Sequence, residues 1–144
     1  MLERGADANV IHSSTLAPLI HLVSLDGKVD VLQLLLQHNA DVNLKSKNEI
    51  GSTPLYNASV RGQVDAVQLL LDHGADIDLQ TAKLSTPLTA ASERGHLETV
   101  RILLRHGANV HNRGRSNKTP LHYATKNGHV EVAQLLLAHG AESE

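Results

Sequence analysis

The segment LLLQHNADVN at residues 34–43 recurs three more times along the chain. It returns as LLLDHGADID at 69–78, as ILLRHGANVH at 102–111 and as LLLAHGAESE at 135–144. A short segment that returns at a fixed interval indicates supersecondary units that stack on one another. We therefore predict a repeat protein with four complete units, and the opening MLERGADAN is similar to the tail of one more.

Each unit carries a helix-start signal followed by a glycine. Thr53, Thr86 and Thr119 stand directly before prolines. A threonine side chain can accept a free N–H of the first turn, and proline at the first helical position has no N–H to satisfy. We expect a short first helix after each signal, closed by a residue in the left-handed conformation. The closing residues are Gly27, Gly62, Gly95 and Gly128.

A second helix is predicted after each of these glycines. In one unit its apolar residues fall at Val64, Val67, Leu70 and Leu71, a helical spacing with one face for burial. Polar segments at 41–52, 76–85 and 109–118 suit hairpin-like turns. The second helices are expected near 28–38, 63–73, 96–106 and 129–139, ending at Asn39, Gly74, Gly107 and Gly140.

The most regular unit identifies a family resemblance. Thr119-Pro120-Leu121-His122, Gly128-His129, Leu135-Leu136-Leu137 and Gly140-Ala141 resemble the ankyrin repeat. The resemblance implies an all-α fold, an ankyrin-repeat solenoid of stacked helix–turn–helix units linked by β-hairpin-like fingers. We expect a single array over 1–144. Residues 1–10 would be the tail of a partial repeat, and the complete units would span approximately 11–46, 47–80, 81–113 and 114–144.

The resemblance also implies that most histidines are structural. The histidine of TPLH holds its turn in this family, and only His122 keeps it, since Ile20, Tyr56 and Thr89 occupy the matching places. His38, His73, His106 and His139 end the second helices, where partial positive charge is favoured. A metal site needs ligands that converge in space, whereas these histidines recur one unit apart. We therefore expect no metal site, no catalytic residues and no cofactor.

The first complete unit departs from the pattern. Ala17 replaces the capping threonine, one extra residue precedes Gly27, and 44–52 is two residues longer than its counterpart. We predict a strained or bulged first helix and a longer finger at 44–52. Leu84 and Asn117 stand where the family has a finger glycine, which Gly51 keeps. We expect a different turn at Leu84, since a branched side chain disfavours positive φ.

Composition excludes several classes of protein. The chain has 144 residues, a net charge of −2 and no cysteine, so disulfides, thiolate zinc sites and cysteine nucleophiles are absent. Its start lacks the features of a signal peptide, and its apolar runs are too short to insert in a membrane. No phosphate-binding loop, nucleophile elbow or HExxH motif is present. We predict a non-enzymatic intracellular protein, in the cytoplasm or the nucleus.

The two ends show little polar capping. The sequence begins within an apparent repeat, and the last helix still has the apolar pattern of an internal one. Terminal repeats of a finished solenoid normally present a polar outer face. We expect either a segment of a longer array or a short product that self-associates through its ends.

Binding is the function that the resemblance implies, through the finger tips and the concave first-helix face. Positions where the units differ are free to contact a partner, and Tyr123 adds an amphipathic anchor. The candidate residues are Glu49, Ile50, Val60, Arg61, Lys83, Glu93, Arg94, Arg115, Lys118, Tyr123 and Lys126.

Charge suggests the kind of partner. Nine of the 13 lysines and arginines lie on predicted fingers or first helices, whereas the second helices carry many acids. Such a basic face steers an acidic protein. Two alternatives stay open: polyanion or nucleic-acid binding by the same patch, disfavoured because stacking aromatics are lacking, and a structural spacer within a larger protein. The nine residues are Lys45, Lys47, Arg61, Lys83, Arg94, Arg113, Arg115, Lys118 and Lys126, and the acids include Asp30, Asp65, Asp72, Glu98 and Glu131.

Overall fold

The computed structural model describes residues 11–12, 17–114 and 116–143. Within them the fold is helical apart from an antiparallel pair of two-residue strands, β1 (Ile11–His12) and β2 (Ala17–Pro18). The predicted tail of a partial repeat, 1–10, lies outside the described residues. The helices are α1 (Leu19–Asp26), α2 (Val29–Gln37), α3 (Pro54–Val60), α4 (Val64–Asp72), α5 (Pro87–Arg94), α6 (Leu97–Arg105), α7 (Pro120–Lys126) and α8 (Val130–Ala138).

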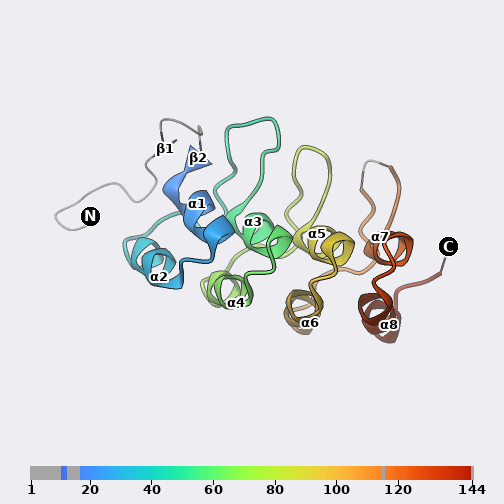
Figure 1. Ribbon diagram of the computed structural model, residues 1–144. Helices are drawn as coiled ribbons and strands as arrows, with labels where there is room; N and C mark the ends of the chain where they lie inside the picture. The colour runs from blue at the N-terminus through green and yellow to red at the C-terminus, as the bar shows by residue number, and fades with distance from the viewer. Residues whose placement is uncertain (1–10, 13–16, 115, 144) are drawn as a thin grey trace.

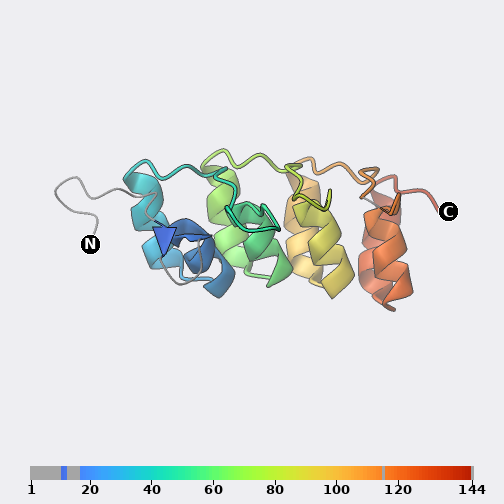
Figure 2. The same ribbon diagram turned by 90° about the horizontal axis from the view of Figure 1, so that it is seen from above.

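The helices form two parallel rows (Figure 1). One row holds α1, α3, α5 and α7, the other holds α2, α4, α6 and α8, and neighbours within each row pack together. The four helix pairs, from α1–α2 to α7–α8, are called the first to fourth repeats. Figure 2 shows the connecting loops following one edge of the stack, with the first and fourth repeats at opposite ends. None of the described helices is long and apolar enough to cross a membrane.

The core runs between repeats. Each helix has seven to nine residues, too few to be stable alone in water, so packing must hold it. One leucine from each second helix is completely buried, and one aliphatic residue from each first helix is almost completely buried. These two ladders are Leu35, Leu70, Leu103 and Leu136, and Ile20, Leu55, Leu88 and Leu121.

The predicted helix starts are confirmed. The hydroxyl oxygens of Thr53, Thr86 and Thr119 accept backbone N–H groups three residues later at 3.1, 3.2 and 3.3 Å. A proline follows each of them as the first helical residue. The glycine ends of the first helices, and the ends of the second helices including Asn39, have positive φ as expected.

The predicted strain in the first helix is wrong. Helix α1 is a regular eight-residue helix of the same length as α5, and each ends directly before a left-handed glycine, Gly27 or Gly95. Counted back from these glycines, the extra residue lies ahead of the helix, where Pro18 belongs to β2. The histidine position of the TPLH motif is consequently held by His21, not by Ile20. Ile20 is fully buried in the core instead.

The first finger is longer, as predicted. Residues 38–53 separate α2 from α3, whereas the shorter stretches 73–86 and 106–119 separate the later pairs. The β-hairpin-like character of the fingers is not confirmed, because their described residues contain no strand. Backbone hydrogen bonds close them instead: Ser46 N to Ser52 O at 2.8 Å, Thr81 N to Ser85 O at 2.9 Å and Gly114 N to Lys118 O at 3.2 Å.

The expected change of turn at Leu84 does not occur. Leu84 has φ of 60°, close to the 59° of Gly51 and the 58° of Asn117. The loop enforces this geometry, because the Thr81 side chain accepts N–H groups from Lys83 and Ser85, and Leu84 N donates to Thr81 O at 2.9 Å. A leucine thus holds a backbone conformation that glycine adopts freely.

We expect Leu84→Gly to stabilise the protein by about 0.5–1 kcal/mol. A left-handed residue with a Cβ costs about 1–2 kcal/mol, and the greater freedom of glycine in the unfolded chain offsets part of this gain. Leu84 is 44% exposed, so little packing is lost. Urea unfolding of the variant and of the unaltered protein measures the difference in the free energy of unfolding. A variant less stable than the unaltered protein would contradict the backbone strain inferred at Leu84.

Candidate functional site

Two adjoining hollows lie on the side of the stack where the fingers meet the first helices. The first, of about 530 Å³, lies among α1, α3, α5 and the first finger. The second, of about 630 Å³, lies one repeat further along, beside the second and third fingers. Ile50, Tyr56 and Glu93 line both, so the two form one continuous surface, here called the groove.

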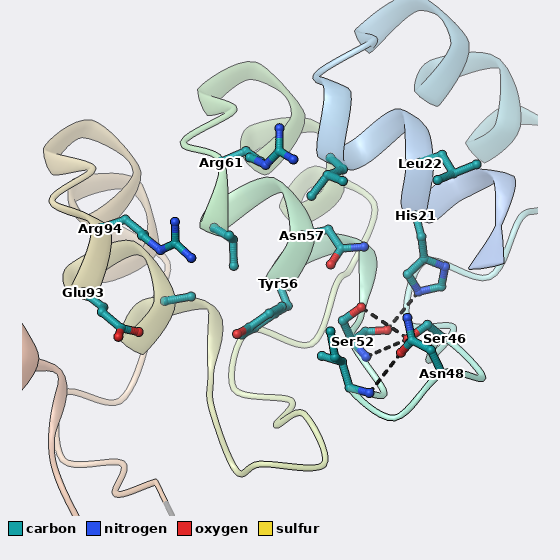
Figure 3. Close-up of a pocket in the computed structure, with 14 residues that line it drawn as sticks. His21, Leu22, Ser46, Asn48, Ser52, Tyr56, Asn57, Arg61, Glu93 and Arg94 are labelled. Carbon is teal, nitrogen blue, oxygen red and sulfur yellow. Dashed lines mark hydrogen bonds between the residues drawn. The ribbon is translucent and has the colours of Figure 1, made fainter. Parts of the chain in front are cut away.

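The first finger is built by one asparagine. The Asn48 side-chain oxygen accepts the backbone N–H groups of Ile50 at 3.0 Å and Gly51 at 3.2 Å, and the Ser46 hydroxyl at 2.8 Å. This turn leaves Ile50 45% exposed beside the groove. The finger is also tied to its neighbours. Ile50 O accepts Ala82 N at 2.8 Å. Ser52 O accepts the His21 Nε2–H at 2.9 Å, as Figure 3 shows.

Two arginines extend over the groove from the ends of first helices. Arg94 is the last residue of α5, and Arg61 directly follows α3 as its C-cap. Both are exposed and line the first hollow, and neither forms a salt bridge with another described residue. Figure 3 shows the two arginine side chains projecting in the same direction, and the side chains of Tyr56 and Asn57 extending from α3. The groove therefore offers unpaired positive charge beside apolar surface.

The groove brings together seven of the predicted binding residues. Glu49 and Lys126 are exposed but line neither hollow, and Lys118 is half-buried outside both. Arg115 lies outside the described residues. The residues that line the groove are Ile50, Val60, Arg61, Lys83, Glu93, Arg94 and Tyr123.

Sequence reasoning missed Tyr56, which lines both hollows. Tyr56 occupies the histidine position of the TPLH motif, which we had assigned to the scaffold. A signal was present, because one of only two aromatic residues in the chain replaces a template residue there. The apolar wall formed by Leu22 and Leu25 was also missed, since nothing in the local sequence shows that they face the first finger.

Four histidines cap the ends of the second helices. His38, His73, His106 and His139 each use Nδ1 to bond the carbonyl four residues earlier, at 2.9–3.0 Å. Because a carbonyl oxygen only accepts, each ring nitrogen must donate. Each of these carbonyls also accepts the backbone N–H of the same histidine, so the ring adds a second hydrogen bond at the end of the helix. No group of three or more possible metal ligands occurs among the described residues.

A second set of side chains links consecutive repeats. His96 Nε2 donates to Val60 O at 2.9 Å, and His129 Nε2 donates to Glu93 O at 3.0 Å. Gln63 has the matching place one repeat earlier and donates to Leu25 O at 3.1 Å. Each bond joins the start of a second helix to the end of the first helix in the preceding repeat. The side chain directly after the mid-repeat glycine is therefore a connector between repeats.

Paired helices in two rows, joined by repeated caps and connectors, define a helical solenoid of the repeat-protein class. A match to a known protein family specifies the kind of solenoid. A family model described as "Ankyrin repeats (3 copies)" matches residues 1–81 and again 79–144, and the chain belongs to the ankyrin-repeat family. Members of this family generally act in protein interaction and are typically non-catalytic.

One curated relative gives a partial match. The chain is 38% identical over 60 residues to the 2-5A-dependent ribonuclease of Mus musculus. The match covers 42% of this chain and 8% of that protein. A match of this extent does not transfer the ribonuclease activity to this chain.

Proposed function

We propose that this chain is a non-catalytic protein-interaction module that binds an acidic segment of a partner protein in the groove. The observation that carries the proposal is the pair of unpaired arginines, Arg61 and Arg94, over a hollow with apolar walls. Interfaces combine such apolar surface with arginine and tyrosine contacts. Family membership supports the general role, and the geometry of the groove supports the place.

Charge supports an acidic partner. Arg61, Lys83 and Arg94 line the groove, with Glu93 as the opposing charge. The second helices lie in the other row and carry exposed acids such as Asp65 and Glu98. A field of this polarity raises the association rate of an acidic partner and orients its approach.

Selection from a displayed random-peptide library against the immobilised chain tests the proposal. We expect the selected peptides to be rich in aspartate and glutamate. Arg61→Glu combined with Arg94→Glu should weaken their binding at least about tenfold, because each reversal turns a charge-assisted contact into a repulsive one. This pair is chosen over Lys126, which lines neither hollow.

Arg105→Glu is the matched control. Arg105 is exposed at the end of α6, in the other row, so the same change of charge there should leave peptide binding intact. The control changes the net charge by the same amount as Arg61→Glu or Arg94→Glu alone, so equal losses in the control and in either single variant would indicate net charge and not a site. Binding of random-sequence DNA with a steep salt dependence would instead favour the polyanion alternative.

A further inference from the structure

Arg61 and Arg94 hold the same position in consecutive repeats. Each directly precedes the glycine that closes a first helix, Gly62 or Gly95. The matching positions hold Asp26 in the first repeat and Asn127 in the fourth. The groove therefore contains two equivalent arginines, flanked at this position by a carboxylate and by a neutral amide.

The distance between repeats sets the spacing of the two charges. Helices α3 and α5 pack side by side, and packed helices have axes about 8–10 Å apart. A polyproline II segment has three residues per turn and rises about 3.1 Å per residue, so residues three apart share one face about 9 Å apart. Two carboxylates at this interval match the spacing of the repeats. In a β-strand, side chains three residues apart point to opposite faces.

The shape of the groove favours the same conformation. A polyproline II segment is thin and commonly docks in grooves lined by aromatic rings. Tyr56 lines both hollows and Tyr123 lines the second, although the whole chain has only two aromatic residues. An α-helix spanning the same interval would be about 10–12 Å wide. That is broad for a first hollow of about 530 Å³.

We propose that the groove binds a partner segment in the polyproline II conformation whose two acidic side chains, three residues apart, contact Arg61 and Arg94. The inference rests on the proposed function and adds the conformation and spacing of the ligand. Asp26 limits where further acidic residues can stand in the ligand. An acidic residue three positions beyond the one that contacts Arg61 would meet the like charge of Asp26.

The test uses fluorescein-labelled synthetic peptides and fluorescence anisotropy with the full chain. One peptide carries two glutamates separated by two prolines, and a second has the same composition with the glutamates adjacent. A third is an alanine-rich helical peptide with glutamates seven residues apart. We expect the first peptide to bind about tenfold more tightly than the second, the factor of one charge-assisted contact. Tighter binding of the third peptide would overturn the conformation, and equal binding of the first two would overturn the spacing.

Charge exchange tests the pairing residue by residue. Replacing either glutamate of the first peptide by lysine gives two further peptides. One lysine-substituted peptide should regain binding to the Arg61→Glu variant and the other to the Arg94→Glu variant. Neither peptide should regain binding to both variants. Rescue of both variants by one peptide, or of neither, would contradict specific pairs. Both arginines are exposed, so circular dichroism should show unchanged helix content in the variants.

The peptide experiments can fail while the proposed function stands, and the two failures can be told apart. Acidic peptides from the library that need Arg61 and Arg94 but show no preferred spacing would leave the interaction face standing and refute this inference. A failure of all the designed peptides to bind would also refute it. The library selection then decides independently whether the groove is an interaction face.

Discussion

Leu70→Ala is expected to lower the free energy of unfolding by about 2–5 kcal/mol, the usual range for truncating a fully buried leucine. Leu70 has 0% exposure in helix α4 and is part of the leucine ladder that joins consecutive repeats. The loss combines burial with the cavity that remains between helices too short to stand alone. Urea unfolding followed by circular dichroism gives the difference, provided that the denaturant slope is unchanged.

Leu137→Ala provides the matched control. Leu137 also lies in a second helix but is 45% exposed in the last repeat, whereas Leu104, its counterpart one repeat earlier, is 7% exposed. The same truncation should cost clearly less there, because less apolar surface returns to water. Equal losses for Leu70→Ala and Leu137→Ala would mean that burial between repeats is not the source of stability.

Gly62→Ala and Gly95→Ala should each cost about 2–4 kcal/mol, combining left-handed strain with the loss of a hydrogen bond. Both glycines have positive φ, of 65° and 75°. A Cβ at Gly62 would lie 2.6 Å from His96 Nδ1, and a Cβ at Gly95 would lie 2.5 Å from His129 Nδ1. Each added methyl group would displace a histidine that joins two repeats.

Gly128→Ala separates the two contributions. Gly128 has φ of 74°, but a Cβ there would have no neighbour within 4 Å among the described atoms outside its own stretch of chain. Only the backbone term remains, so the cost should be about 1–2 kcal/mol. Chemical unfolding of the three variants measures the difference. The same loss at all three positions would show that the histidine connectors add nothing to stability.

The sequence was informative wherever a local rule decides the structure. The Thr-Pro starts at Thr53 and Thr86, and the left-handed ends at Asn39 and Gly74, are set by groups within one helical turn. The second helices were therefore predicted to within one residue at each end. The family resemblance, confirmed by the family match, supplied the stacking that no local rule contains.

Two predictions went wrong, one because of packing between repeats and one because of hydrogen bonds within a loop. In the first repeat we aligned the helix from Pro18, but burial of Ile20 between repeats aligns it from Gly27. At Leu84, hydrogen bonds to Thr81 within the loop impose a φ that leucine disfavours. The first constraint comes from atoms far away in the sequence, and the second from a hydrogen-bonded turn within the loop that the propensity of leucine alone does not describe.

The groove was only partly predictable for the same reason. Variable positions pointed to Arg61 and Arg94, which do line it. The role of Tyr56 depends on how the first finger lies over the next helix, a relation that Asn48 and the Ser52–His21 bond establish. The spacing of residues in the sequence does not show that the first finger and this helix lie against each other.

We propose that the regular residues hold the repeats together and that the groove binds the partner. Amide chemical shifts of the ¹⁵N-labelled chain, titrated with the peptide carrying two spaced glutamates, test it most directly. We expect shifts concentrated at Ile50, Tyr56 and Arg94, with the outer face of α4 and α6 unchanged. Shifts concentrated on those second helices, with the groove silent, would contradict it.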